Sequence, residues 1–200
     1  MAVNKRVLAA SLAAAVVISV GGGFLLSRTQ DASPGNGSAQ DSITIASSGV
    51  YSEPGQLPTN AVVQGKQLPI VDLTDNSGNS ISTQDLIGHP LVINVWATTC
   101  EPCKREMPAL AAVQDELGDK VRFIGVNTAA NTPSALAFAK DKGVHYELLS
   151  DLDGALQSAL GVTGLPYTIF VAADGTIVAQ KGVELDQATI RSTITSKLLP

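Results

Sequence analysis

The chain of 200 residues contains little that could bind a metal ion, since it has only two cysteines and two histidines. Two cysteines cannot make the closed four-ligand zinc site that a second pair, or a nearby pair of histidines, would complete. His89 and His145 do not stand at metal-ligand spacing from each other or from the cysteines, and we expect both to lie in turns. We therefore expect neither a metal site nor a cofactor.

The sequence is also short of charge, and it has no excess of basic residues. Charged residues make up 16% of the chain, and the net charge is −5 with an isoelectric point near 4.9. A nucleic-acid-binding protein usually carries a basic face, so this balance argues against a nucleic-acid partner. No long run of a single sign occurs, which is typical of an ordinary solvated surface.

Residues 7–26 form a run of twenty residues without a charge, directly after Lys5 and Arg6. A helix needs ~20 residues to cross the ~30 Å hydrocarbon core of a bilayer. A cleavable secretion signal has a shorter apolar core, of about 7–15 residues, followed by a small-x-small cleavage site. Residues 25–31 offer no good site of that kind. We therefore expect an uncleaved membrane anchor, with a cleaved signal as the alternative.

The flanking charges predict how this run is oriented. Lys5 and Arg6 outweigh Arg28 on the other side, so the positive-inside rule places the N-terminus in the cytoplasm and the remainder outside. A cleaved signal would also place the remainder outside. An uncleaved anchor predicts a single-pass protein of a bacterial cell membrane whose remaining residues lie on the extracytoplasmic side.

The composition divides the chain into three parts. We expect an anchor or signal at residues 1–27, a flexible linker at 28–60 and a folded domain at 61–200. The linker is rich in Ser, Gly, Asn, Gln, Asp, Ala and Pro, and such segments bury too little apolar surface to order themselves.

The folded part alternates apolar runs with helical stretches, which indicates an α/β domain. Residues 91–96 (LVINVW) form a continuous apolar run, typical of a buried central strand. The other expected strands are 68–73 paired with 80–81 as a β-hairpin, 121–126, 146–149, and 168–171 paired with 177–180 as a second hairpin. The expected helices are 100–117, 133–142, 154–160 and 186–199, with a short helical turn from 82 to 88.

The two cysteines stand three apart, in Cys100-Glu101-Pro102-Cys103, at the predicted start of the helix that follows the central strand. Thiol–disulfide exchange requires a thiolate that attacks a disulfide, and a thiol has a reference pKa of ~8.5. The N-terminus of a helix stabilises an anion, so Cys100 is the expected nucleophile. Cys103 lies one turn further in and can resolve the mixed disulfide. A purely structural disulfide would gain little chain entropy from so short a loop.

The run WATTCEPCKREMPAL after the LVIN strand, with GLPYTIF and DGTIV later in the chain, resembles thioredoxin-like proteins. More narrowly, it resembles the membrane-tethered TlpA/ResA-type thiol–disulfide oxidoreductases, from about Leu68 to the C-terminus. The resemblance implies an α/β thioredoxin-like fold with an N-terminal β-hairpin and a central helical insertion, here preceded by one transmembrane helix. It also implies action on cytochrome c maturation or on other extracytoplasmic thiols.

The resemblance assigns roles to residues around the cysteines. Glu106 completes CEPCxxE and is implied to tune the cysteines and relay protons; helical spacing places it beneath the pair. A solvated helix glutamate is the alternative. Asn94 stands where thioredoxin itself has a buried Asp, and Glu101 is implied to shape the redox potential.

The late GLPYTIF segment supplies two further candidates. Pro166 matches the cis-proline of the family, whose loop keeps its main chain open to pair with the substrate chain. Leu165 precedes it and is implied to touch the substrate. Thr99 departs from the pattern, because many relatives carry Trp immediately before the first cysteine, so we expect a reduced hydrophobic rim for partner docking.

We predict an extracytoplasmic thiol–disulfide oxidoreductase that reduces disulfides of specific secreted proteins, such as apocytochrome c, and is itself reduced by a membrane thiol carrier. A disulfide-forming oxidase of secreted proteins is the first alternative. A copper-binding thiol chaperone is the second, since soft thiolates favour Cu(I). A peroxiredoxin is excluded because Ile93 and Ala97 stand where its Pro and Thr would precede Cys100.

Overall fold

The computed structural model describes residues 59–200. The predicted anchor and all of the predicted linker up to residue 58 lie outside the described residues. Within residues 59–200, no helix is both long enough and apolar enough to cross a bilayer.

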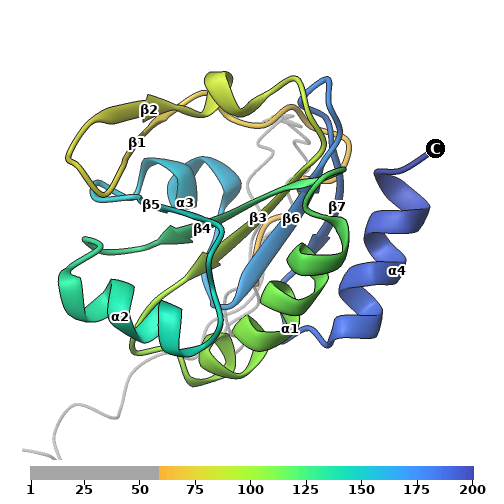
Figure 1. Cartoon of the computed structure of the whole chain (residues 1–200). Coiled ribbons are helices and arrows are strands. Elements are labelled where there is room, and N and C mark those ends of the chain that lie inside the picture. The colour runs from red at the N-terminus through yellow and green to blue at the C-terminus, as the bar shows by residue number, and fades with distance from the viewer. Residues whose placement is uncertain (1–58) are drawn as a thin grey trace, which may run out of the picture. The chain divides into compact units, whose positions relative to one another are not determined.

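The sheet is built outward from β3, Leu91–Trp96, the apolar run that predicted a central strand. All six of its residues are buried. It pairs in parallel with β4, Arg122–Asn127, and antiparallel with β6, Tyr167–Val171. The remaining strands are β1 Asp72–Thr74, β2 Ser80–Ser82, β5 Glu147–Ser150 and β7 Ile177–Lys181. The seven strands run in the order β2-β1-β5-β4-β3-β6-β7 (Figure 1).

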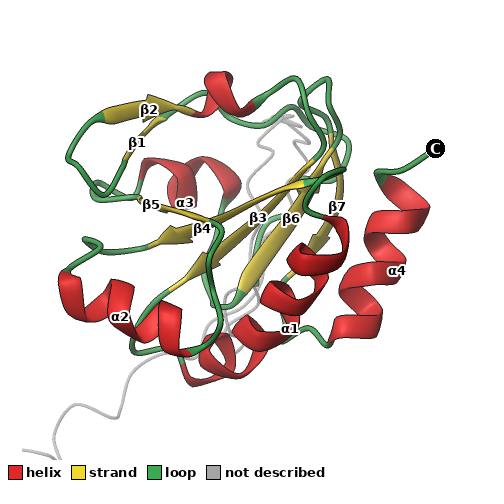
Figure 2. Cartoon of the chain, in the orientation of Figure 1, coloured by secondary structure: helices red, strands yellow, loops and turns green. Residues whose placement is uncertain are grey.

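Helices cover both faces of this sheet, as Figure 2 shows. They are α1 Glu101–Leu117, α2 Pro133–Asp141, α3 Ala155–Leu160 and α4 Gln187–Lys197, with a 3-10 turn, η1, at Thr83–Leu86. Because successive strand residues point to opposite faces, Ile93 packs in the cluster that includes Leu156 of α3, whereas Val92 packs with Leu110 of α1 and Ile190 of α4. Trp96 faces the same side as α1, in a third cluster with α2.

The strand expected at 68–73 was wrong in extent, because Pro69 splits it. Proline has no N–H to give to a ladder. Before it, Gln67 bridges to Thr176 and the N–H of Leu68 bonds to the carbonyl of Gly175. After it, only Asp72–Thr74 is strand, paired with β2 and, at Thr74, with β5. The chain therefore contacts the β7 side of the sheet before the proline and pairs with β2 and β5, on the opposite side, after it.

The predicted helix boundaries lie within two residues of those observed. Three helices start one residue later than expected because Cys100, Gly154 and Asp186 are the N-caps of α1, α3 and α4 rather than their first residues. An N-cap has non-helical backbone angles although its carbonyl already accepts a helical bond. This shift matters for α1, because it places Cys100 at the N-cap, directly before the first turn of the helix.

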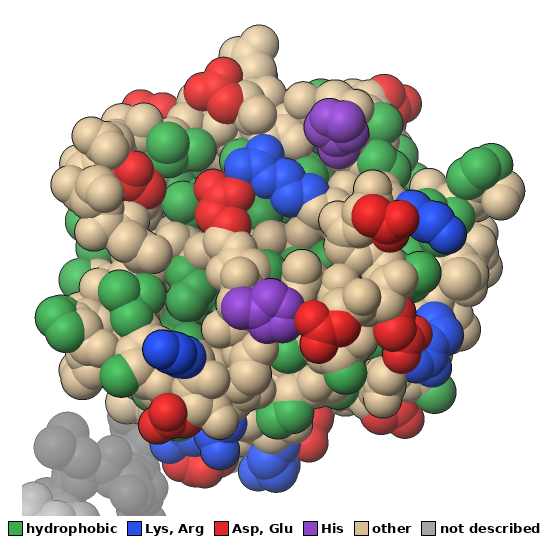
Figure 3. All heavy atoms as spheres, in the orientation of Figure 1, with side chains coloured by type: hydrophobic (Ala, Val, Ile, Leu, Met, Phe, Trp, Pro, Cys, Tyr) green, Lys and Arg blue, Asp and Glu red, His purple; other side chains and the backbone are tan. Residues whose placement is uncertain are grey.

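Charged side chains of both signs are interspersed on the face drawn in Figure 3. Ion pairs between elements of the described domain include Arg105–Glu184, Arg122–Glu147 and Arg191–Glu116. Exposed pairs of this kind add little to stability, because water and salt screen the attraction between the charges. This face therefore offers no single-sign patch.

Candidate active site

The disulfide between Cys100 and Cys103 opens helix α1, with 5.3 Å between the two Cα atoms. Cys100 has extended backbone angles, φ −86° and ψ 102°, and its Sγ accepts a hydrogen bond from the N–H of Cys103 at 3.2 Å. Pro102 lies in the first turn, where a missing N–H loses no helical bond. The sulfur of Cys100 is thus set against the unpaired N–H groups of a helix N-terminus, where a thiolate is stabilised.

The two cysteines differ in their access to solvent. Cys103 has no exposed surface and packs in the cluster around Trp96, whereas Cys100 is half-buried at the edge of that cluster. An incoming sulfur can therefore reach Cys100 more readily than Cys103. This difference fits the order of attack predicted from the sequence.

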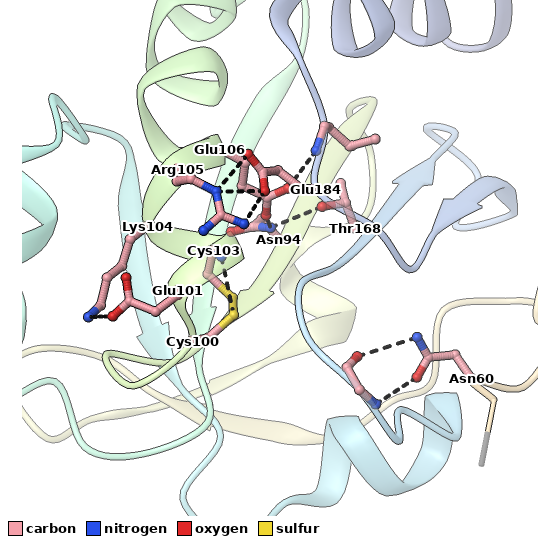
Figure 4. Close-up of a disulfide and its surroundings, with 12 residues drawn as sticks. Asn60, Asn94, Cys100, Glu101, Cys103, Lys104, Arg105, Glu106, Thr168 and Glu184 are labelled. Atoms are coloured by element: carbon pink, nitrogen blue, oxygen red, sulfur yellow. Dashed lines mark hydrogen bonds and ion pairs between the residues drawn. A yellow bond between two sulfur atoms is a disulfide. The ribbon is translucent and has the colours of Figure 1, made fainter. Parts of the chain in front are cut away.

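Glu106 lies on α1 and is fully buried, so the alternative of a solvated helix glutamate is wrong. Its Oε1 accepts a hydrogen bond from Nδ2 of Asn94 at 2.6 Å, and its Oε2 accepts from the main-chain N–H of Leu185 at 3.1 Å. Nδ2 of Asn94 also donates to Oγ1 of Thr168 at 2.9 Å. Figure 4 shows this chain of contacts behind the disulfide. One carboxyl group thereby joins α1 to β3 and to the segment before α4.

Burial raises the pKa of Glu106 to about 7, against the opposing effect of its hydrogen bonds from Leu185 and Asn94, and the nearby Glu184 carboxylate adds to the rise. A buried acid with a pKa near neutrality exchanges its proton in the range where enzymes work. Glu106 can therefore hold or release a proton close to the cysteines.

Oδ1 of Asn94 has no hydrogen-bond partner among residues 59–200 although it is buried. The assignment of amide oxygen and nitrogen follows the hydrogen-bond network, and here Nδ2 faces the carboxylate. If Glu106 is protonated, it can donate to Oδ1 once the amide turns over. Asn94 can thus serve both protonation states of Glu106 without itself carrying a charge.

Glu101, between the two cysteines, is exposed and forms an ion pair with Lys104. Its pKa is lowered, chiefly by the hydrogen bond from Lys104. The ammonium group of Lys104 also lies 5.7 Å from the ring centre of Phe138 on α2. Glu101 is therefore an ionised group on the outer rim of the site, unlike the buried Glu106.

The loop from Gly161 to Pro166, directly before β6, carries the other two predicted residues. The Leu165–Pro166 peptide bond is cis, as the resemblance implies. Pro166 is buried, and the half-buried Leu165 packs against the cluster that contains Cys103 and Trp96. The structure thus brings Leu165 to the same cluster that Cys100 borders.

Three contributors to the site were not predicted from the sequence, namely Thr168, Leu185 and Asn60. Thr168 is the register partner of Asn94 on β6; a correct strand alignment could have found it. Leu185 acts through its main chain, so no side-chain pattern could have indicated it. Asn60 lies 104 positions before Gly164, which it bonds, and nothing in the local sequence distinguishes it from a linker residue.

No group of three or more His, Cys, Asp or Glu side chains in residues 59–200 is arranged to hold a metal ion. The chemistry that the described residues support is exchange at the disulfide. It combines an accessible sulfur at a helix N-terminus, a buried second sulfur and a buried acid that titrates near neutral pH.

Comparison with known proteins agrees with this chemistry. The sequence profile of the family described as Redoxin matches residues 63–196. Thiol:disulfide interchange protein DsbE of Pseudomonas fluorescens biotype C is 34% identical over 152 residues, covering 74% of this chain and 82% of that protein. Thiol-disulfide oxidoreductase ResA of Bacillus subtilis (strain 168) is 30% identical over 119 residues, covering 59% of this chain and 66% of that protein.

Solved structures give the same fold. A DsbE thiol:disulfide interchange protein from Chlorobium tepidum superposes with a TM-score of 0.61 at 21% identity, covering 68% of this chain and 98% of that one. The Mycobacterium tuberculosis dsbF structure superposes with a TM-score of 0.57 at 25% identity, covering 63% of this chain and 93% of that one. The similarity thus extends over most of residues 59–200.

Proposed function

Because the chain belongs to the Redoxin family and is a thiol–disulfide oxidoreductase of the DsbE/ResA type, we propose that it reduces disulfides of specific partner proteins outside the cytoplasm. The observation that carries this proposal is the Cys100–Cys103 pair at the N-terminus of α1 with the buried Glu106 behind it. The partners have the chemistry of secreted polypeptides with a cysteine pair, such as apocytochrome c.

The proposed reaction starts from the reduced enzyme. The Cys100 thiolate attacks one sulfur of the substrate disulfide, which forms a mixed disulfide and releases the other substrate sulfur as a thiolate. Cys103 then loses its proton and attacks Cys100, so the substrate leaves as a dithiol and the enzyme keeps the Cys100–Cys103 disulfide. Two electrons pass from enzyme to substrate. Glu106, three residues after Cys103 on the same helix, is the buried base available for the Cys103 proton.

Electrostatics supports the reducing direction. An ionised Glu106 disfavours a second negative charge close to it, so it raises the pKa of the nearer thiol. A thiolate destabilised in this way makes the reduced enzyme less favoured and a better electron donor. The enzyme would then be returned to its dithiol form by a membrane thiol carrier, close to which the predicted anchor at residues 7–26 would hold it.

The midpoint potential of the purified protein in dithiothreitol or glutathione buffers tests this direction. We expect a value well below that of the strong oxidant DsbA, about −120 mV, and closer to that of thioredoxin, about −270 mV. A midpoint near about −120 mV would contradict the reductant and favour a disulfide-forming oxidase.

The contribution of Glu106 is measured in the same titration. Glu106→Gln should raise the midpoint by tens of millivolts, given that ~30 mV corresponds to about 1.4 kcal/mol for a two-electron couple. Glu116→Gln is the matched control, because Glu116 lies on the same helix but is ion-paired with Arg191 at the surface. If Glu106→Gln and Glu116→Gln had the same midpoint potential, Glu106 would not determine the potential.

A further inference from the structure

Asn60, at the start of the described chain, bonds the loop that leads to Leu165 and Pro166. Its Oδ1 accepts hydrogen bonds from the main-chain N–H of Thr163 at 2.7 Å and of Gly164 at 3.0 Å, and from the Thr163 hydroxyl at 3.3 Å. Its Nδ2 donates to the carbonyl of Gly164 at 3.3 Å. The two contacts with Gly164 are drawn in Figure 4. The side chain therefore holds both main-chain polar groups of Gly164.

Glycines at positions 182 and 161 leave room for Asn60 and for its neighbour Ala61, whereas larger residues at these positions would not. A Cβ atom at Gly182 would lie 2.6 Å from Nδ2 of Asn60, and one at Gly161 would lie 2.5 Å from Cβ of Ala61. Gly161 also has a φ of +62°, which favours glycine, and its carbonyl accepts from the N–H of Ala61 at 3.0 Å. Two glycines from separate segments thus accommodate residues 60 and 61 against the loop.

Leu165 follows Gly164, whose main chain is bonded by Asn60, and the main chain of Leu165 itself is unpaired within the described residues. Within residues 59–200, the N–H and C=O groups of Leu165 make no hydrogen bond. Leu165 also borders the cluster that Cys100 borders. An extended substrate chain whose cysteine approaches Cys100 can therefore add main-chain hydrogen bonds at Leu165, in the manner of strand addition.

We propose that Asn60 is a positioning residue for substrate binding: by fixing Gly164 it pre-orders the main chain of Leu165 to receive an extended polypeptide next to Cys100. Without the clamp, the loop would have to be ordered at the moment of binding, and ordering one backbone residue corresponds to about a tenfold change in an equilibrium constant. The inference rests on exchange at Cys100–Cys103, and it is independent of the direction in which electrons flow.

The test compares two disulfides on the full-length protein. One is a model peptide carrying an oxidised Cys-x-x-Cys pair, and the other is bis(2-hydroxyethyl) disulfide, which has no peptide main chain. Asn60→Ala should raise KM for the peptide by about tenfold while kcat and the rate constant with the small disulfide stay within about twofold. A general structural defect would instead impair both substrates. The reverse reaction, with oxidised enzyme and dithiol peptide, should show the same selective effect.

Three further variants sharpen the comparison. Asn60→Asp keeps the acceptor for both N–H groups and should restore most of the peptide affinity. Gly182→Ala keeps Asn60 but places a methyl group against its amide, so it should raise the peptide KM as Asn60→Ala does. Asn76→Ala is the matched control, since Asn76 is an exposed asparagine that joins two other loops through Asn131.

Two outcomes would overturn the proposal. The first is a peptide KM for Asn60→Ala that stays within about twofold of wild type, or that rises no more than for Asn76→Ala. The second is a wild-type enzyme whose KM does not differ between the peptide and the small disulfide. A midpoint potential in the range of a strong oxidant would overturn only the proposed reducing direction. The selective effect of Asn60→Ala on the peptide is measured both with reduced enzyme and with oxidised enzyme, so it does not depend on that direction.

Discussion

Glu106 is a carboxylic acid with no exposed surface, and its surroundings determine its charge. Burial raises its pKa to about 7 from the usual 4.5 of a glutamate, and the hydrogen bonds from Leu185 and Asn94 only partly oppose that rise. The folded protein therefore keeps this proton over a pH range in which the unfolded chain has already released it. Proton uptake at this residue is thereby linked to folding.

This linkage predicts a pH-dependent stability. The contribution of protonated Glu106 is fully present below pH 4.5 and is lost as the pH rises through about 7, because the folded state must then hold a buried charge. Over that window the loss is about 3 kcal/mol. Urea unfolding of the oxidised protein between pH 5 and 8 should show the decline in wild type and a flatter profile in Glu106→Gln. Parallel profiles for the two proteins would contradict it.

The difference in burial between the cysteines predicts their chemical order. In the reduced protein, Cys100 should react with iodoacetamide faster than Cys103, which has no exposed surface. Cys103→Ser should then trap a mixed disulfide between Cys100 and a partner, and mass spectrometry of the modified peptides identifies the sulfur. Partners trapped only by Cys100→Ser would reverse the order.

Site residues that lie close together in the sequence could be predicted, and those that lie far apart could not. Cys100, Cys103 and Glu106 fall within seven residues, so helical spacing alone predicted that they lie together. The partners that fix the state of Glu106 come from β3 and from Leu185, 79 positions later. Spacing along the chain carries no information about contacts of that kind. The hydrogen-bond partners of the buried Glu106 therefore emerged only from the structure.

At the scale of elements, the strongest signals in the sequence were those in which one short segment decides its own structure. β3 is a continuous apolar run and was predicted with its observed bounds, Leu91–Trp96. Residues 68–73 gave a weaker signal, because Pro69 interrupts the ladder and the two sides of the proline pair with different strands. A hydrophobic run thus predicts burial more reliably than it predicts continuity of pairing.

The start of α2 gives a test of local structure. Thr132 is its N-cap, and the hydroxyl oxygen accepts from the N–H of Ala135 at 3.2 Å. Removing such a cap costs about 1 kcal/mol, so Thr132→Ala should lower the free energy of unfolding by that amount in a urea titration. Thr132→Ser keeps the oxygen and serves as the control. Equal losses in the two variants would mean that the cap is not the cause.

At the scale of the whole molecule, the thioredoxin-like domain joins elements from distant parts of the chain at one site. α1 provides the cysteines and Glu106, β3 provides Asn94, the loop before β6 provides Leu165, and Asn60 comes from the start of the domain. The edge of the predicted linker therefore contacts the proposed substrate loop.

The predicted anchor leads to an expectation for the intact protein in a bacterial cell. If residues 7–26 span the membrane, the protein should stay in the membrane fraction after a carbonate wash, and alkaline phosphatase fused to its C-terminus should be active. The twenty uncharged residues match the ~20 needed to span the hydrocarbon core, and Lys5 and Arg6 should hold the N-terminus inside. A chain that begins at residue 28 is the control, which should leave the membrane fraction and give an inactive fusion. A purified mature protein whose first residue lies beyond Leu26 would identify the segment as a cleaved signal and contradict the anchor.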